Sequence, residues 1–231
     1  MRRAVAACVV ACGLLLISWH WLADPVASFS THRAQSALLH DVRRGPAAGA
    51  DAVVARPVPR GHALAVMRIP RFGSSWVWAV SEGVSQSVLA NGPGHYPRTA
   101  LPGGRGNAAF AAHRAGHGDP FIDFDRLRRG DRVLLTQGGT TWVYRLDGPP
   151  RIVPTSATWV LAPTSGRELT LTTCWPKYGS ARRMFVHGHL VRPVTSGALR
   201  LVSSGRSRPH RATRWRAPAG TRHAMARLSG G

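Results

Sequence analysis

Cys174 is the residue of this sequence best suited to covalent chemistry. It stands near the end of the stretch from Leu169 to Pro176, which reads LTLTTCWP. Alternate residues of a strand face opposite sides, so the two leucines and Thr173 are expected on one face, and Thr170 and Thr172 with the thiol on the other. Proline cannot donate to a sheet ladder and the segment after it is turn-like, so the strand is expected to end beside a loop.

The Cys174 thiol has no partner for a disulfide within its own domain. The chain has three cysteines, and the other two, Cys8 and Cys12, lie in an apolar N-terminal segment. A lone cysteine in a chain with histidines elsewhere is a candidate nucleophile, whereas the alternative is an inert buried thiol. Composition alone leaves both interpretations open.

Several sequence blocks together resemble the sortase family. Its signature is a Thr-Leu-x-Thr-Cys strand end followed by an arginine on the next strand, and Thr170 to Cys174 fits it. Residues 92–97, 99–103 and 106–114 are similar to the blocks that lead to the family's catalytic histidine, and residues 118–131 continue the similarity. The resemblance covers about residues 64–194 and is closest to the class E, housekeeping-type sortases of high-GC Gram-positive bacteria.

The resemblance implies three catalytic residues. Cys174 would be the nucleophile and His113 the general acid and later the base. Arg183 would donate to the oxyanion or to the substrate backbone. The choice of Arg183 over Arg182 rests on strand alternation. Arg182 falls on the same face as the apolar residues Met184, Val186 and Leu190, which are expected to point inward, so Arg183 falls on the outer face. The alternative is that both arginines lie in the loop before the strand.

His95, Tyr96, Thr172 and Thr173 are the candidate substrate-binding residues. His95 precedes Tyr96 in the loop where the family builds its substrate groove, and simple loop packing is the alternative. His117, four residues after the catalytic histidine, is expected to be a surface histidine.

No metal or other cofactor is expected. His113 with His117, or His187 with His189, could be paired ligands, but neither pair comes with a thiolate or carboxylate at a familiar zinc spacing. The acidic calcium-binding cluster of class A sortases is not apparent either.

The predicted function is that of a membrane-anchored cysteine transpeptidase. The resemblance implies cleavage of a C-terminal sorting signal between Thr and Gly, a thioester on Cys174, and transfer to an amine of lipid II or of a peptidoglycan stem peptide. It also implies a preference for Leu-Ala-x-Thr-Gly over Leu-Pro-x-Thr-Gly. The alternatives are a pilus-polymerising sortase, which uses a lysine of another subunit, and a catalytically silent wall-binding barrel.

The chain divides into four segments. Residues 1–23 are expected to form a cytoplasmic start and a transmembrane anchor, because residues 4–23 contain no Asp, Glu, Lys or Arg and follow Arg2 and Arg3. A cleaved signal peptide is the less favoured alternative. Residues 24–61 are expected to form an extracellular stalk that is disordered or carries a loosely packed helix over 31–44, and residues 62–195 are expected to form the catalytic domain. The predicted location is the cell membrane, with a single span and the monomeric catalytic domain outside.

Residues 196–231 are a basic tail that is expected to be disordered. From Arg200 onward it has eight arginines and no acidic residue, within a chain whose formal net charge is +21. Adhesion to anionic wall polymer or lipid is the functional interpretation, and a solvated extension is the other. Nucleic-acid binding is not expected, because it fits poorly with an outside location.

The fold class is predicted to be all-β. Short strands separated by Gly and Pro residues indicate a closed barrel. The resemblance implies about eight strands with short helices. The expected strands are 64–70, 76–80, 108–112, 132–136, 141–146, 169–174 and 184–191, with a hairpin turn at 137–140 and brief helices at 84–90 and 120–127.

Overall fold

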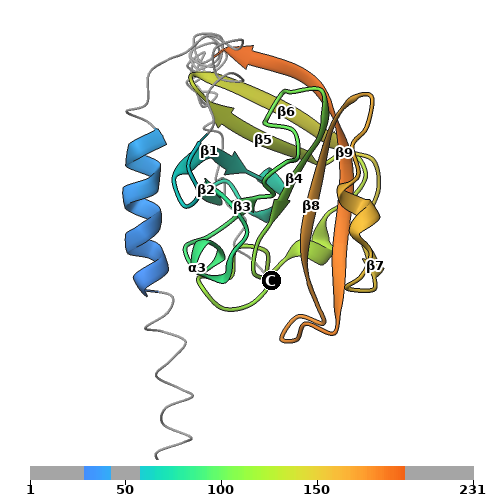
Figure 1. Ribbon diagram of the computed structural model, residues 1–231, viewed down its shortest axis with the longest axis horizontal. Helices are drawn as coiled ribbons and strands as arrows, with labels where there is room; N and C mark the ends of the chain where they lie inside the picture. The colour runs from blue at the N-terminus through green and yellow to red at the C-terminus, as the bar shows by residue number, and fades with distance from the viewer. Residues whose placement is uncertain (1–28, 43–57, 196–231) are drawn as a thin grey trace, which may run out of the picture.

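Figure 1 shows the computed structural model of the chain, in which residues 29–42 and 58–195 are described. Residues 58–195 contain nine strands and four short helical segments. The strands are β1 (Ala63–Arg68), β2 (Val77–Glu82), β3 (Gly94–His95), β4 (Gly106–Ala111), β5 (Arg132–Gln137), β6 (Thr140–Leu146), β7 (Arg151–Val153), β8 (Arg167–Trp175) and β9 (Arg182–Thr195). The helical segments are η1 (Pro70–Phe72), α3 (Gln86–Leu89), η2 (Phe124–Arg126) and η3 (Thr158–Leu161).

Eight of these strands close into a barrel. The sheet order is β6-β5-β1-β2-β3-β4-β8-β9-β7, and β6 also pairs with β9, so the ring returns to its first strand. The long β9 makes this possible, because its first half pairs with β7 on one edge and its second half pairs with β6 on that same edge. The prediction of a closed, all-β barrel of about eight strands is therefore confirmed.

The barrel interior is filled by every second side chain of each strand, namely those that point inward. Leu169 and Leu171 of β8 and Met184 and Val186 of β9 belong to the buried apolar cluster, together with large side chains such as Phe110, Tyr144 and Leu135 from the other strands. Phe185 points the other way and is covered by Trp159 of η3, with ring centroids 5.4 Å apart. The inward and outward alternation expected for β9 is thus observed.

The hairpin between β5 and β6 turns at Gly138 and Gly139. Both have positive φ, 53° and 79°, which is the conformation that a two-residue turn of this kind needs and that glycine adopts without steric strain. The turn fixes the ladder in which Gln137 pairs with Thr140. This is the hairpin that the sequence predicted at residues 137–140.

A helix over residues 29–42 lies alongside the barrel (Figure 1). Its buried Gln35 accepts a hydrogen bond from Ala79 N at 2.7 Å and donates to Ala79 O at 3.1 Å and Asn91 O at 2.6 Å. Thr31 Oγ1 donates to Ala90 O at 2.8 Å. The possible helix over residues 31–44 is thus observed at 29–42, and buried hydrogen bonds hold it against β2.

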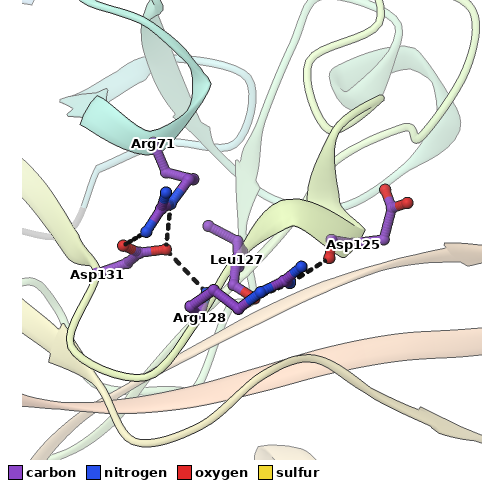
Figure 2. A network of polar contacts seen from close by, with 5 residues as sticks. All are labelled: Arg71, Asp125, Leu127, Arg128 and Asp131. Atoms are coloured by element: carbon purple, nitrogen blue, oxygen red, sulfur yellow. Dashed lines mark hydrogen bonds and ion pairs between the residues drawn. The ribbon is translucent and has the colours of Figure 1, made fainter.

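Figure 2 shows the polar contacts that fasten the segment before β5. Asp131 accepts two hydrogen bonds from Arg71, at 2.7 and 2.8 Å, and one from Arg128 N at 2.8 Å. These contacts lower the pKa of Asp131, chiefly through the Arg71 hydrogen bonds. Arg128 also donates to the carbonyls of Asp125 and Leu127. Together they tie η1 to the η2–β5 connection.

No helix within residues 29–42 and 58–195 is both long and apolar enough to cross a membrane. The transmembrane segment predicted at residues 4–23 and the tail at 196–231 lie outside the described residues. Both therefore stay predictions.

Candidate active site

Cys174 and Arg183 face each other across the ladder of β8 and β9. They are direct partners in the antiparallel register, one residue before the pairing ends at Trp175 and Arg182. Direct partners project from the same face of a sheet, with Cβ atoms roughly 5 Å apart. Cys174 is partly exposed and forms no disulfide. The register therefore places a thiol and a guanidinium side by side on the outside of the barrel.

His113 follows β4 by two residues, and β8 fixes its backbone. Ala112 N donates to Thr172 O at 3.3 Å, and Thr173 Oγ1 donates to Ala112 O at 2.9 Å. Because β4 and β8 run parallel, both strands end at the same edge of the sheet, where the histidine and the cysteine meet. Phe121 N then donates to His113 O at 3.1 Å, which closes the loop that follows.

One groove of about 640 Å³ contains all three predicted catalytic side chains. Cys174 and Arg183 line it together with His113 from the β4 end. Residues 177–180 of the β8–β9 loop form another wall, and Gln86 of α3 a further one. The structure thus brings Cys174, His113 and Arg183 together, as the alternation and the resemblance predicted.

The Arg183 guanidinium is held at the rim of this groove. Its Nη1 donates to Ser180 O at 3.0 Å and to Arg182 O at 3.1 Å. Both acceptors are backbone carbonyls, so the positive charge of Arg183 is not neutralised by a carboxylate among the described residues. The charge is available to an anion that forms in the groove.

The imidazole of His113 is half-buried, and its environment favours the neutral form. Burial lowers the pKa of His113, and the charge of His117 lowers it further. The Nε2 atom is buried without a hydrogen-bond partner in the described structure. A half-buried imidazole that lines the groove can exchange a proton with a bound molecule.

Arg114 anchors the chain directly after the histidine. Its side chain is only 5% exposed, forms an ion pair with Asp125 at 3.0 Å and contacts Met184 Sδ at 3.1 Å. Met184 lies next to Arg183 on β9, so this contact links the histidine loop to the arginine strand. Arg114 is not among the site residues predicted from the sequence, although it belongs to the block 106–114 that resembles the family.

The four candidate substrate-binding residues lie outside the groove. His95 is 1% exposed. It pairs with Glu82 at 2.7 Å, and its Nε2 lies 2.9 Å from Ala100 O and 3.0 Å from Thr99 Oγ1. These contacts fasten the β3–β4 loop, which fits the loop-packing alternative. A role for His95 in substrate binding stays a prediction.

Tyr96, Thr172 and Thr173 connect neighbouring strands. Tyr96 Oη lies 3.0 Å from Thr172 Oγ1, which also donates to Phe110 O at 3.3 Å. Both threonines are buried. Their polar atoms hold β4 and the β3–β4 loop against β8, and contact with a substrate stays a prediction for all three residues.

Metal ligation finds no support in the part of the chain that the structure describes. No group of three or more His, Cys, Asp or Glu side chains there could hold an ion. His113 and His117 stack ring on ring, and His187 bonds to Thr170 while His189 pairs with Asp147.

The closed barrel gathers a thiol, an imidazole and a guanidinium in one outer groove, the combination of groups that thiol-dependent acyl transfer uses. Comparison with known proteins identifies the class of protein. Residues 67–191, more than half of the chain, match the family model described as "Sortase domain". The chain belongs to the sortase family.

Its relatives include class E sortases. Sortase SrtE1 of Streptomyces coelicolor is 34% identical over 154 residues, which cover 59% of this chain and 43% of that protein. Sortase SrtE2 of the same organism is 33% identical over 130 residues, covering 49% and 50%. The chain thus matches only about half the length of these curated relatives or less.

Solved structures agree with this assignment. Sortase E from Streptomyces avermitilis is 40% identical with a TM-score of 0.57, over 61% of this chain and 95% of that one. Sortase E1 from Streptomyces coelicolor, solved with a tripeptide in the active site, is 30% identical with a TM-score of 0.53, over 62% and 99%. The predicted resemblance to class E sortases is confirmed.

Proposed function

We propose that this protein is a membrane-anchored transpeptidase that cuts a C-terminal sorting signal and joins the released carbonyl to a cell-wall amine. One observation carries the proposal. Cys174 and Arg183 are direct ladder partners, and His113 lines the same groove. A nucleophile, a proton-transfer group and an oxyanion donor are the three parts that thiol-dependent acyl transfer needs.

The first half-reaction forms a thioester. As the Cys174 sulfur attacks the carbonyl carbon of the Thr–Gly bond, His113 accepts the thiol proton, and the carbonyl oxygen takes the electron pair and becomes an oxyanion that Arg183 can stabilise. Collapse of this intermediate breaks the C–N bond, and His113 gives its proton to the leaving amine of glycine. The threonyl group is left as a thioester on the enzyme.

The second half-reaction runs through the same groups in reverse. The neutral His113 accepts a proton from the incoming amine as its nitrogen attacks the thioester carbon. The resulting oxyanion again lies beside Arg183, and its collapse forms the new amide and expels the Cys174 thiolate, which takes the proton back from His113. Both half-reactions therefore use His113 once as an acid and once as a base.

The proposed substrates are exported proteins that carry Leu-Ala-x-Thr-Gly or Leu-Pro-x-Thr-Gly, with the first preferred. The similarity to class E sortases supports this preference. That a related structure binds a tripeptide in its active site supports a short peptide motif as the recognised element. The proposed acceptor is an amine of lipid II or of a peptidoglycan stem peptide, and no cofactor takes part.

Capture of the thioester tests the proposal. The full-length protein is incubated with a Leu-Ala-x-Thr-Gly peptide, with and without an amine acceptor, and intact-protein mass spectrometry follows Cys174. We expect an acyl adduct that disappears when the amine is added. Cys174→Ala should form none, and His113→Ala should retain only a trace of turnover because the two act as a unit. Full transpeptidation by His113→Ala would contradict the assignment, and the absence of any adduct in the unaltered protein would favour a silent binding barrel.

Membrane attachment through residues 4–23 is part of the proposal. The support is the uncharged span behind Arg2 and Arg3, which the positive-inside rule orients with the catalytic domain outside. In cell fractions we expect the protein in the membrane with Arg2 and Arg3 still present. A main species that is secreted and begins near Asp24 or Val26 would instead establish a cleaved signal peptide.

A further inference from the structure

The orientation of the His113 imidazole needs a cause that hydrogen bonding does not supply. Within residues 29–42 and 58–195 no carbonyl or side chain hydrogen bonds to its ring, and Nε2 is buried without a partner. In many nucleophilic enzymes a third group hydrogen bonds to the catalytic histidine and holds its ring toward the nucleophile. In this protein a contact other than a hydrogen bond has to hold the His113 ring in its orientation.

His117 makes that contact. Its ring is stacked on the ring of His113, with centroids 4.7 Å apart and planes inclined by 26°. His113 lines the groove that contains Cys174, whereas His117 is not among the groove-lining residues. His117 therefore contacts the ring of His113 without itself lining the groove.

The loop fixes His117 in this place. Gly116 N donates to Asp119 Oδ1 at 2.7 Å, and Asp119 N donates to Gly116 O at 3.1 Å, so a short turn encloses His117. Gly118 lies so close to Trp78 that a Cβ there would come within 2.9 Å of the indole ring. The backbone of His117 itself is left-handed, with φ at 54°, a region that few non-glycine residues occupy.

We propose that His117 is a positioning residue, which holds the imidazole of His113 toward Cys174 by ring stacking in place of a hydrogen-bonding third group. The inference rests on the proposed acid and base role of His113. It assigns a function to a histidine that the sequence alone indicated as a surface residue.

The stack also couples the two rings electrostatically. A neutral ring can stack on an imidazolium, whereas two imidazolium rings repel each other. The other ionisable groups that line the groove with His113 are Arg114 and Asp119 of its own loop, Cys174 of β8, Lys177 and Tyr178 of the β8–β9 loop and Arg183 of β9. Of the charged groups, only His117 contributes to the lowered pKa of His113, in addition to burial.

Two substitutions separate stacking from other roles of His117. His117→Asn removes the ring and keeps a residue type that tolerates left-handed backbone. His117→Phe removes the titrating group and keeps an aromatic ring. The matched control is His62→Ala, an exposed histidine outside the groove. The full-length variants are assayed for kcat and KM with the sorting peptide and an amine across pH, and thermal unfolding confirms their folding.

We expect His117→Asn to lower kcat by roughly 10- to 100-fold, the scale on which a misplaced catalytic group acts, with little change in KM. His117→Phe should recover most of the rate, and His62→Ala should match the unaltered protein. Loss of the His117 charge should raise the pKa of His113 in both variants, because that charge lowers it. The kcat–pH profile should shift with it.

A second measurement is independent of turnover. In a Cys174→Ala background, NMR titration of the His113 ring should show the same upward shift in both His117 variants. A normal kcat in His117→Asn, or a His117→Phe as slow as His117→Asn, overturns the positioning role. Full activity of His113→Ala would instead remove the proposed function, while the NMR titration would still report whether the rings are coupled.

Discussion

At the scale of single residues, the site depends on a register between two strands rather than on any one loop. Cys174 pairs with Arg183, and Trp175 pairs with Arg182. A shift of one residue would bring Arg182 opposite the thiol on the outer face and would turn every side chain of β9 to the other face of the sheet. The inward Met184 and Val186 prevent such a shift, because it would expose buried apolar side chains to water.

Substitution of the two arginines should therefore have unequal effects. We expect Arg183→Ala to reduce the transpeptidation rate by roughly 10²- to 10³-fold, the range seen on removal of one oxyanion donor. Arg183→Lys should recover little, because an ammonium cannot reproduce the planar fork of a guanidinium. Rates are measured with the sorting peptide and an amine.

Arg182→Ala is the matched control, since Arg182 is exposed, adjacent in sequence and absent from the groove lining. It should keep near-normal activity. If Arg182→Ala were inactive and Arg183→Ala active, the ladder partner of Cys174 would not be the catalytic arginine.

The sequence predicted this part of the site because alternation is a local property. The parity of Met184 and Val186 was sufficient to place Arg183 on the outer face. The contacts of His95 and His117 could not be obtained in this way, because they depend on Glu82 and on the path of the loop after His113. Neither is encoded in a periodic pattern.

At the scale of elements, the helix over residues 29–42 completes an exposed strand edge. β2 pairs with β3 only at Ser81 and Glu82, which leaves the outer edge of Ala79 without a strand partner. The Gln35 carboxamide binds both Ala79 N and Ala79 O, as a neighbouring strand would. The close approach of Gly92 helps, because a Cβ there would lie 2.3 Å from Gln35 Nε2.

Gln35→Ala should loosen this helix. The substitution leaves the N–H and C=O of the fully buried Ala79 without partners, a penalty of about 1–3 kcal/mol for each buried group that water does not reach. We expect a lower midpoint in urea unfolding and faster hydrogen exchange at Ala79 and in the helix. Ser36→Ala is the control, because Ser36 is exposed and bonds only within the helix, to Arg33 O. Equal exchange in both variants would mean that Gln35 does not hold the helix.

Strands that are long enough to show an apolar pattern were predicted from the sequence, and the shortest strands were not. The seven strands with alternating or continuous apolar residues were expected within a few residues of their observed bounds. β3 has two residues and β7 has three, which is too short for alternation to be recognised. Their existence depends on pairing with β2, β4 and β9, so only the assembled sheet defines them.

At the scale of the whole molecule, the barrel closes where β6 meets β9. Gly188 lies at this meeting point, between Leu146 of β6 and Leu169 of β8. A Cβ on Gly188 would lie 2.6 Å from Arg145 O and 3.1 Å from Arg145 C. Both are backbone atoms, which cannot move aside as a flexible side chain could. The absence of a side chain therefore lets the first and last strands of the ring approach each other.

Gly188→Ala should consequently weaken barrel closure. The added methyl group has to push β6 away from β9, and overpacking of this kind destabilises by about 1–3 kcal/mol. We expect a lower urea midpoint and faster hydrogen exchange in β6 and in residues 188–191 of β9. Gly148→Ala is the matched control, because no atom lies within 4 Å of a Cβ at that position, and its stability should change by no more than about 0.5 kcal/mol. Expressed as a free energy, the loss in transpeptidation rate should be smaller than the loss in stability. The reason is that Cys174 and Arg183 belong to the other half of the β9 ladder. Equal midpoints for the two variants would show that the close approach at Gly188 does not determine how the barrel closes.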